Sequence, residues 1–424
     1  MRRPTNFTPL HHRGFQLLIA GQLASNVGDL FYAVALPWYV LATHGGALLL
    51  GTVLAAYGVP RTVLLAVGGH AADRFRPWNV MMGADAVRAL AVAGLAVAAF
   101  AGPARAYVMI PIAIVLGAGE GMFLPSSMAI VPSLLPGEDL QAGNALASGS
   151  NQLSTILGPV LGGLVVAAVG PASAFVVDAA SFVVSVAALV GVRSITRQPV
   201  PARVPTTANS LDDDDAETAS VPAAPTSVWG LLRSERILQL MVLVTIAANL
   251  GFGGMSEVAL PALVHGPLHD GASGYGLVIA AFGGGALFGT LVAGRFTAMA
   301  RPAVTASWCF LASAVAIGAV PYVGGTVVVA LALALFGVAN GFGNVVTITL
   351  FQRWAPPAMM GRLMGVMMLA SMGLFPASVF VGGVVVSHVG PSVFFPLAGG
   401  ALALAVLAAL SQRSWREFGA TVAP

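Results

Sequence analysis

Apolar residues gather in twelve long segments along the chain, and most polar residues fall between these segments. About 20 apolar residues in a helix span a hydrocarbon core of about 30 Å while satisfying their own backbone hydrogen bonds. We therefore predict an all-α membrane protein with twelve transmembrane helices. The segments cover residues 15–42, 47–70, 79–101, 106–134, 143–169, 172–193, 237–262, 274–299, 302–321, 325–350, 362–388 and 392–412.

The composition supports lipid as the solvent of this chain. Of its residues, 57% are hydrophobic and 8% are charged, whereas a soluble domain has a charged fraction of roughly 25%. The net charge of +3 does not indicate nucleic acid, because the basic residues are dispersed between apolar segments. The single Cys309 excludes an internal disulfide and a cysteine metal site. Residues 1–14 are basic, and the long apolar stretch after them is expected to stay as the first helix rather than to be cleaved.

The basic residues are distributed unevenly between the two ends of the predicted helices. All 19 are arginines, of which Arg105 alone lies on one side, and Arg61 and Arg88 lie within helices. Because cytoplasmic connections carry an excess of basic residues, we predict a multi-pass plasma (inner) membrane protein with both termini in the cytoplasm. The sixteen arginines on the cytoplasmic side are Arg2, Arg3, Arg13, Arg74, Arg76, Arg193, Arg197, Arg203, Arg233, Arg236, Arg295, Arg301, Arg353, Arg362, Arg413 and Arg416.

A polar stretch between the sixth and seventh segments divides the chain. It contains five prolines and the acidic run Asp212–Asp215, and such a composition cannot bury a core. We interpret the run as part of a solvated linker rather than as a metal-binding motif. The predicted organisation is a cytoplasmic tail (1–13), a six-helix bundle (14–193), a cytoplasmic linker (194–235), a second six-helix bundle (236–412) and a cytoplasmic tail (413–424).

The two predicted bundles resemble each other in sequence. Ala55–Gly58 recurs as Ala280–Gly283, and Asn26–Pro37 recurs with one insertion as Asn249–Pro261. Three such matches in the same order indicate a duplicated six-helix unit, which is a layout typical of secondary transporters. The third match joins Gly117, Glu120, Gly121 and Pro136 to Gly337, Asn340, Gly341 and Pro356 at a constant offset of 220.

Charged residues inside the predicted helices are costly, at about 2.5 to 3.5 kcal/mol each at mid-bilayer, so each is expected to be paired, to face a cavity or to be functional. Asp29 lies fourteen residues after the start of the first segment, and Arg61 lies fourteen residues into the second, which runs the opposite way. At 1.5 Å per residue both lie about 21 Å from opposite faces, so we expect that they can pair. A permanent ion pair and a role in substrate or proton binding are both open.

Glu120 also lies fourteen residues into its segment, and it has no basic neighbour in the sequence. It is the main candidate for the carboxylate that carries a coupled proton. The alternative is a permanently protonated Glu120 that forms a hydrogen bond across helices. Its counterpart in the second half is the uncharged Asn340.

Four further charged residues lie closer to the helix ends. Asp178 and Glu257 are expected in the outer third of their helices, where water or a lipid headgroup can satisfy them if transport does not use them. Asp85 and Arg88 are three residues apart. We expect them to form a local pair near the cytoplasmic end of the third helix.

The connection between the second and third helices contains Gly69, three further residues, Asp73 and the basic Arg74. This spacing resembles the loop motif of the major facilitator superfamily. Pro77 and Trp78 stand where further basic residues are usual, and Ala293–Phe296 is a decayed copy without the Asp. The resemblance implies that Asp73 contacts the start of the eleventh helix and that this contact breaks when the halves rock. The alternative is a loop that only sets the topology. The motif residues are Gly69, Asp73, Arg74 and Arg76.

The fifth segment is similar to the helix-five motif of the antiporters in this superfamily. Small residues four apart allow close approach of helices, and a proline removes a backbone hydrogen-bond donor and kinks the helix. The resemblance implies export rather than uptake, and generic packing of small residues is the alternative. The motif residues are Ala145 and Ser154, which replace glycines of the motif, and Gly158, Pro159, Gly162 and Gly163.

Further similarity lies in Phe123–Ser127 with Pro136–Glu138, in Phe175–Phe182 and in Gln352–Arg362. Together these segments resemble the bacterial exporter branch that includes siderophore and macrolide efflux proteins. The arginine expected on the fourth helix of proton-driven drug antiporters has no counterpart in Ile110–Leu116. The coupling residues of those antiporters are therefore not carried over.

The resemblance implies a monomeric secondary transporter that exports a drug, antibiotic, siderophore or other small amphipathic or hydrophobic metabolite by proton antiport with alternating access. Its partners would be the substrate, protons and the bilayer, with the proton gradient as energy source and no cofactor. The alternatives are an uncoupled facilitator or importer of the same fold, and a non-transporting receptor or membrane enzyme. The sequence contains no nucleophile elbow, phosphate-binding loop or zinc-binding helix motif, so no catalytic or metal-ligating residue is predicted.

Overall fold

The computed structural model describes residues 8–195, 228–296, 299–355 and 360–420, and every regular element in this part of the chain is helical. The elements of the N-terminal half are η1 Thr8–His11, α1 Arg13–Ala42, α2 Gly46–Phe75, α3 Pro77–Ala101, α4 Ala106–Leu134, η2 Gly137–Asp139, α5 Leu140–Val169 and α6 Pro171–Ile195. Those of the C-terminal half are α7 Val228–Ser234, α8 Arg236–Gly254, η3 Met255–Ala259, α9 Leu260–His265, α10 Ala272–Ala293, α11 Pro302–Ala319, η4 Val320–Tyr322, α12 Thr326–Trp354, α13 Met360–Met372, α14 Phe375–Val389, α15 Pro391–Ser411 and α16 Arg413–Arg416.

Eleven helical spans among the described residues are long and apolar enough to cross a membrane. The helix α5 is the twelfth crossing, although only its second part, Leu157–Val169, is strongly apolar. Its first part carries amides and hydroxyls, among them Asn144 and Ser150. The predicted class, an all-α membrane protein, is confirmed.

The helix ends differ from the predicted ones in informative places. The second helix continues to Phe75, so that Arg76 alone joins it to α3, and the eighth predicted segment ends earlier, at Ala293. Of the predicted linker, residues 196–227 lie outside the described residues, and the acidic run Asp212–Asp215 lies there with them. The remaining linker residues that the structure describes are largely helical and belong to α6 and α7.

Two spans of the C-terminal half are interrupted where they pack together. The first runs through α8, η3 and α9, and η3 is a single π-helical turn, which leaves backbone groups without their usual helical partners. The hydroxyl of Ser378 on α14 accepts a hydrogen bond from the N–H of Gly254 at 2.7 Å and donates one to the carbonyl of Leu250 at 2.6 Å. The second span breaks at Gly373, between α13 and α14.

The duplicated unit is visible in how the helices cross. In the N-terminal half, a methyl group added at Gly117 of α4 would collide with the backbone carbonyl of Tyr57 on α2. In the C-terminal half, one added at Gly337 of α12 would collide with the carbonyl of Phe282 on α10. These residues are the counterparts that the sequence repeat pairs, so the same glycine-mediated crossing occurs in both halves.

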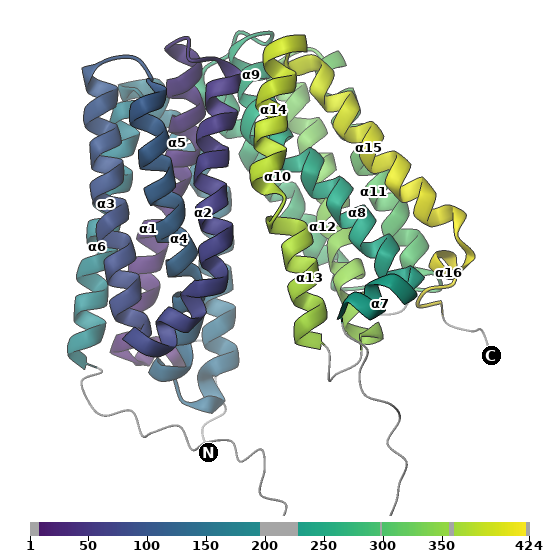
Figure 1. Cartoon of the computed structure of the whole chain (residues 1–424), viewed down its shortest axis with the longest axis horizontal. Coiled ribbons are helices and arrows are strands. Elements are labelled where there is room, and N and C mark those ends of the chain that lie inside the picture. The colour runs from purple at the N-terminus through teal and green to yellow at the C-terminus, as the bar shows by residue number, and fades with distance from the viewer. Residues whose placement is uncertain (1–7, 196–227, 297–298, 356–359, 421–424) are drawn as a thin grey trace, which may run out of the picture.

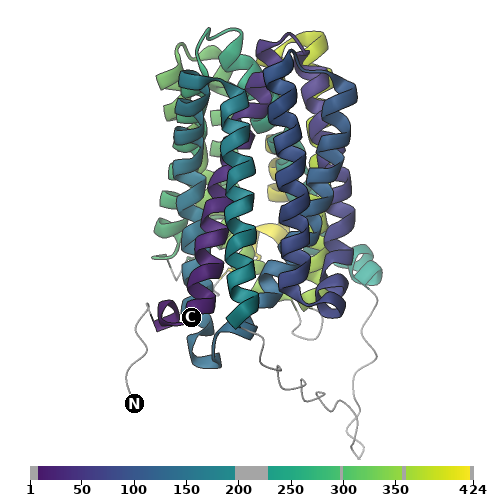
Figure 2. The same ribbon diagram turned by 90° about the vertical axis from the view of Figure 1, so that its left-hand side faces the viewer.

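The two halves share one end of the molecule and separate toward the other (Figure 1). One apolar cluster includes residues of both halves, such as Val40 and Val264. At the opposite end, each half has a cluster of its own, with Phe15 in the N-terminal half and Leu238 and Trp415 in the C-terminal half. Figure 2 shows the N-terminal half face on, with η1 at the end where the halves separate.

Close contacts at the shared end join α1 to α9 and α2 to α14. The ring of Trp38 meets that of His265 edge to face, with centroids 4.9 Å apart. A Cβ added at Gly51 would lie 2.9 Å from Cα of Gly383. The structure is therefore closed at the end opposite to η1 and α16.

Candidate functional site

Arg88 of α3 is the centre of an ion-pair network inside the N-terminal half. Its Nη2 donates a hydrogen bond to Oδ1 of Asp29 on α1 at 2.7 Å, and its Nη1 donates one to Oδ1 of Asp85 at 3.3 Å. The second oxygen of Asp85 accepts a hydrogen bond from the hydroxyl of Ser185 on α6 at 2.6 Å. Three helices are thus joined through one guanidinium group.

The guanidinium group of Arg88 lies between aromatic rings. It is 4.1 Å from the ring centroid of Phe182 and 5.6 Å from that of Phe123, and such stacking stabilises a cation away from water. Its side chain is 4% exposed and that of Asp29 is 40% exposed. Asp29 is therefore the accessible member of this network.

A second ion pair joins α2 to α4. Nε of Arg61 lies 3.1 Å from Oε1 of Glu120, but its N–H is not aimed at the carboxylate and forms no hydrogen bond. The two side chains are 19% and 24% exposed. The close α2–α4 crossing brings them together, since Gly121 packs against the backbone of Arg61.

These contacts correct two expectations from the sequence and show a partner for Glu120. Asp29 does not pair with Arg61, because Arg88 and Glu120 are their respective partners. Glu120, which has no basic neighbour in the sequence, has one in space. The pair of Asp85 and Arg88 forms as expected, but it lies in the middle of α3 and is buried rather than near the helix end.

Asp178 of α6 is buried in the N-terminal half, with 1% of its surface exposed. A Cβ added at Gly28 of α1 would lie 2.7 Å from its Oδ1, so the glycine makes room for the carboxylate. The hydroxyl of Ser181 lies 3.5 Å from the same oxygen and donates its shorter bond, of 2.7 Å, to the backbone carbonyl of Asp178. The expectation that water or a headgroup would satisfy Asp178 is therefore wrong, since protein surrounds it.

Glu257 brings the C-terminal half to the site. It lies in the π-helical turn η3 and is within electrostatic range of Arg61. Tyr32 of α1 is within electrostatic range of Glu257 and of the carboxylates of Glu120 and Asp178. These residues therefore converge from both halves, whereas Asn340 of α12 is half-buried in the C-terminal half and has no charge.

The loop motif is part of a helix rather than a loop. Gly69, Asp73 and Arg74 belong to the last turns of α2, and Arg76 follows with φ of 66°. The arginines are exposed. The predicted contact of Asp73 with the start of the eleventh helix falls on side chains outside the described residues.

The helix-five motif lies where α5 meets the other half. A Cβ at Gly158 would press on Leu30 of α1. One at Gly163 would lie 2.7 Å from the carbonyl of Ala272 on α10, and one at Gly276 would collide with the carbonyl of Pro159.

The remaining members of the motif differ in what they contact. Gly162 packs against the backbone of Phe31 on α1. Ser154 is buried and bonds to the carbonyl of Ser150, whereas the side chain of Ala145 lies outside the described ones. The motif thus forms part of the interface between halves at the closed end.

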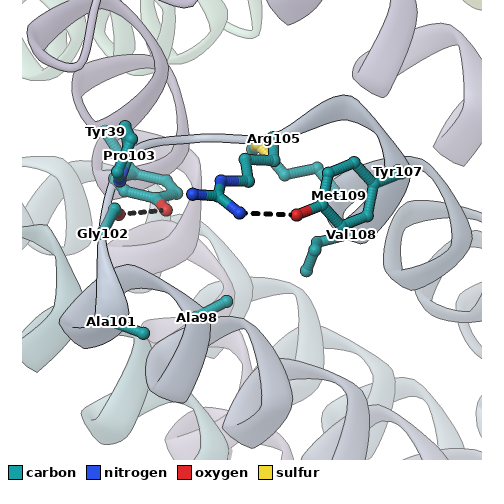
Figure 3. A pocket seen from close by; sticks show the side chains of 9 residues that line it. All are labelled: Tyr39, Ala98, Ala101, Gly102, Pro103, Arg105, Tyr107, Val108 and Met109. Atoms are coloured by element: carbon teal, nitrogen blue, oxygen red, sulfur yellow. Dashed lines mark hydrogen bonds between the residues drawn. The ribbon is translucent and has the colours of Figure 1, made fainter.

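A small pocket of about 160 Å³ lies at the α3–α4 connection (Figure 3). The hydroxyl of Tyr39 donates to the carbonyl of Gly102 at 2.9 Å, and Arg105 donates to the hydroxyl of Tyr107 at 2.7 Å. The latter bond raises the pKa of the Arg105 guanidinium further above its ordinary value. The residues of the ion-pair network are not among those that line this pocket.

Sequence reasoning missed Arg88, Ser185 and Tyr32 as members of the site. Arg88 carried a signal, because a base in the middle of an apolar helix must find a counter-charge. Ser185 and Tyr32 carried none, since serine and tyrosine are common in membrane helices.

The comparisons place the chain among known proteins. The profile of a family described as "Transmembrane secretion effector" matches residues 4–419. The multidrug efflux pump Tap of Mycobacterium tuberculosis (strain ATCC 25618 / H37Rv) is 32% identical over 179 residues, which are 41% of this chain and 42% of Tap, so the match spans less than half of that protein. The enterobactin exporter EntS of Escherichia coli O81 (strain ED1a) is 25% identical over 362 residues, 84% of this chain and 80% of EntS.

Solved structures share the fold. A bacterial homologue of the iron transporter ferroportin in an inward-facing state superposes with a TM-score of 0.71 at 16% identity, covering 95% of this chain and 98% of that one. The nucleoside transporter NupG superposes with a TM-score of 0.70 at 15% identity, covering 94% and 99%.

Proposed function

Since the chain belongs to the transmembrane secretion effector family of the major facilitator superfamily, we propose that it exports a small amphipathic or hydrophobic molecule across the plasma membrane in exchange for protons. Membership makes it a multi-pass transporter and not an enzyme. The proposal adds the direction, the energy source and the class of substrate.

One observation carries the coupling: two partly exposed carboxylates, Asp29 and Glu120, are each paired with an arginine in the middle of the N-terminal half. A proton that binds Glu120 removes its negative charge and weakens its attraction to Arg61, which keeps its own charge. Proton binding at one end of the cycle and release at the other can therefore change how the helices α2 and α4 are held together. An ion pair without a hydrogen bond is easier to separate than the bonded pair of Asp29 and Arg88.

Two observations support export. The helix-five motif, which the resemblance associates with antiporters, packs against α10 at the closed end. The relatives named above are an efflux pump and an exporter. With both termini in the cytoplasm, the structure would be open toward the side from which an exported substrate binds.

The test is Glu120→Gln, which keeps the shape of the side chain and cannot titrate. In inverted membrane vesicles, proton-driven accumulation of a substrate found by screening amphipathic antibiotics and siderophores should fall to background. Substrate binding in detergent should persist and lose its pH dependence, because the affinities for proton and substrate are linked reciprocally. Asn340→Gln is the matched control at the equivalent position of the other half and should keep coupled transport.

Proton-coupled transport at the wild-type rate in Glu120→Gln would remove Glu120 from the mechanism and direct attention to Asp29. Substrate movement without any proton flux in the unmodified protein would instead indicate a facilitator.

A further inference from the structure

A groove of about 640 Å³ runs along the N-terminal half, between α2, α3 and α4. Apolar side chains and glycines form its walls, and Asn79 is its one polar lining residue among those described. The lining residues are Leu64, Ala71, Phe75, Asn79, Val80, Gly83, Ala84, Val87, Val115, Ala118, Gly119 and Met122.

The groove opens toward the bilayer rather than toward the other half. α3 packs against α2, α4 and α6 and lies on the side of the molecule away from the C-terminal half (Figure 1). Phe75 and Val87 in its walls are 58% and 45% exposed. Exposed apolar side chains on a membrane-spanning helix contact lipid chains, so this groove faces the hydrocarbon core of the bilayer.

Its length matches one leaflet. On α3 the lining runs from Asn79 to Val87, a rise of eight steps along the helix or about 12 Å. On α2 it runs from Leu64 to Phe75, a rise of eleven steps along the helix or about 16 Å. Half of a hydrocarbon core is about 15 Å. The groove therefore accommodates a chain that enters from one surface and ends near the middle of the bilayer.

Two arginines stand at the surface end of the groove. Arg74 and Arg76 flank the lining residue Phe75, and both are exposed. Their guanidinium groups lie 5.5 Å and 5.6 Å from the rings of Phe75 and Trp78. Within the described part of the chain, neither arginine forms an ion pair with a carboxylate.

We propose that this groove binds one acyl chain of an anionic phospholipid from the cytoplasmic leaflet and that Arg74 and Arg76 bind its phosphate group. The apolar length accounts for the chain, and the two cations at its end account for the sign of the headgroup. Basic residues near a membrane surface attract anionic lipid. This proposal concerns lipid binding and is independent of the transported substrate.

The floor of the groove connects the lipid to the ion-pair network. Ala84 and Gly119 line the groove, and a Cβ added at Gly119 would lie 2.7 Å from Cγ of Arg88. The aliphatic part of Arg88 therefore lies directly behind the groove. A bound acyl chain packs against the wall that keeps Arg88 away from lipid.

The test uses native mass spectrometry of the purified full-length protein, titrated with dioleoyl phosphatidylglycerol or with dioleoyl phosphatidylcholine. Two arginines at the surface predict a preference for phosphatidylglycerol on the order of tenfold. Gly83→Phe should remove the tightest binding step, since a Cβ there meets no atom within 4 Å and the ring can extend into the groove. Gly94→Phe on the same helix is the matched control, because its Cβ is equally free and it does not line the groove.

The headgroup is tested separately with Arg74→Gln combined with Arg76→Gln, which should reduce the preference to about that of phosphatidylcholine. Arg353→Gln, at the exposed end of α12, should retain it. Equal binding of phosphatidylglycerol by Gly83→Phe and Gly94→Phe would overturn the groove as the site, and equal affinity of the wild type for both lipids would overturn the role of the arginines. A third outcome would also overturn the proposal. In it, an exported substrate displaces the lipid from the wild type, and Gly83→Phe raises the Michaelis constant of transport without changing lipid binding. The groove would then be a route for the substrate.

Discussion

Arg88 is the residue that holds together the ion-pair network inside the N-terminal half. It is 3% exposed and serves two carboxylates at once, Asp29 and Asp85. A charge removed from water is tolerated when it is paired and hydrogen-bonded, and losing one partner leaves the other uncompensated. Asp85 is 0% exposed, and without Arg88 its one remaining partner among the described side chains would be the hydroxyl of Ser185. The stability of the N-terminal half therefore depends on the positive charge of Arg88 and on its position.

The change Arg88→Met should destabilise the protein by about 3 to 5 kcal/mol, the cost of breaking a buried pair. Adding Asp85→Asn should recover a large part of this loss, because the stranded carboxylate is neutralised. The measurement is thermal unfolding of the purified protein in detergent, analysed as a double-mutant cycle. Arg353→Met, an exposed arginine, is the control and should change little. Additive losses in the double variant would show that the two residues do not act as a pair.

At the scale of elements, the two halves use their helices differently. The crossings of α2 with α4 and of α10 with α12 are equivalent, as the glycine contacts show. The helix interruptions are not equivalent in the two halves, because the π-helical turn η3 and the break before α14 both lie in the C-terminal half. Ser378 satisfies the backbone at the first interruption and belongs to the helix that follows the second. One hydroxyl therefore holds two bent helices together near the interface with α2.

We expect Ser378→Ala to destabilise the protein by about 1 to 3 kcal/mol, since it leaves the N–H of Gly254 and the carbonyl of Leu250 with fewer partners in a buried place. It should also slow transport, because the bend in α8 and α9 is no longer fixed. Ser387→Ala, on the exposed end of the same helix, should affect neither property. Thermal unfolding and transport are measured on the same preparations. An unchanged midpoint of thermal unfolding in Ser378→Ala would contradict this prediction and would mean that water replaces the hydroxyl.

The sequence predicted the helices well and their neighbours poorly. Hydropathy gives the depth of a residue, and Asp29, Arg61 and Glu120 do lie in the middle of their helices. Depth says nothing of which helices touch or how each is rotated about its axis. α1 packs mainly on α5 and α6, whereas α2 packs on α4, so Arg61 meets Glu120 and not Asp29. The apolar pattern also does not indicate the π-helical turn. An uninterrupted run of apolar residues is compatible with an α-helix and with a π-helix.

For the whole molecule, the central fact is that the halves meet at one end and stand apart at the other (Figure 1). Each half keeps its own apolar cluster at the separated end, so the halves can move there without opening either bundle. The contacts at the closed end include close approaches of glycines to backbone, as at Gly51 and Gly163, beside apolar and aromatic side chains such as Trp38. Such an interface can be parted and rebuilt as a unit, which is what alternating access requires.

The distribution of the arginines predicts that the open end faces the cytoplasm, and reporter fusions test this orientation. Fusions at Asp213 and after Pro424 should both give cytoplasmic signals, because the basic residues at the terminal end stay inside. A fusion after Pro103, in the connection beside Arg105, should give an external signal and serves as the control. An external signal from either of the first two would reverse the orientation or change the number of crossings.

The unequal charge of the two halves has a consequence for how such a protein can change over generations. The positions that hold Arg61 and Glu120 in the first half are Ala286 and Asn340 in the second, and the second half instead stacks Phe282 on Phe336, with centroids 5.1 Å apart, beside Phe252. Duplication thus left two copies of one unit free to specialise. Under selection by a new toxic compound, we expect adaptive substitutions to collect around the aromatic rings of the second copy, while the charged residues of the first remain as they are.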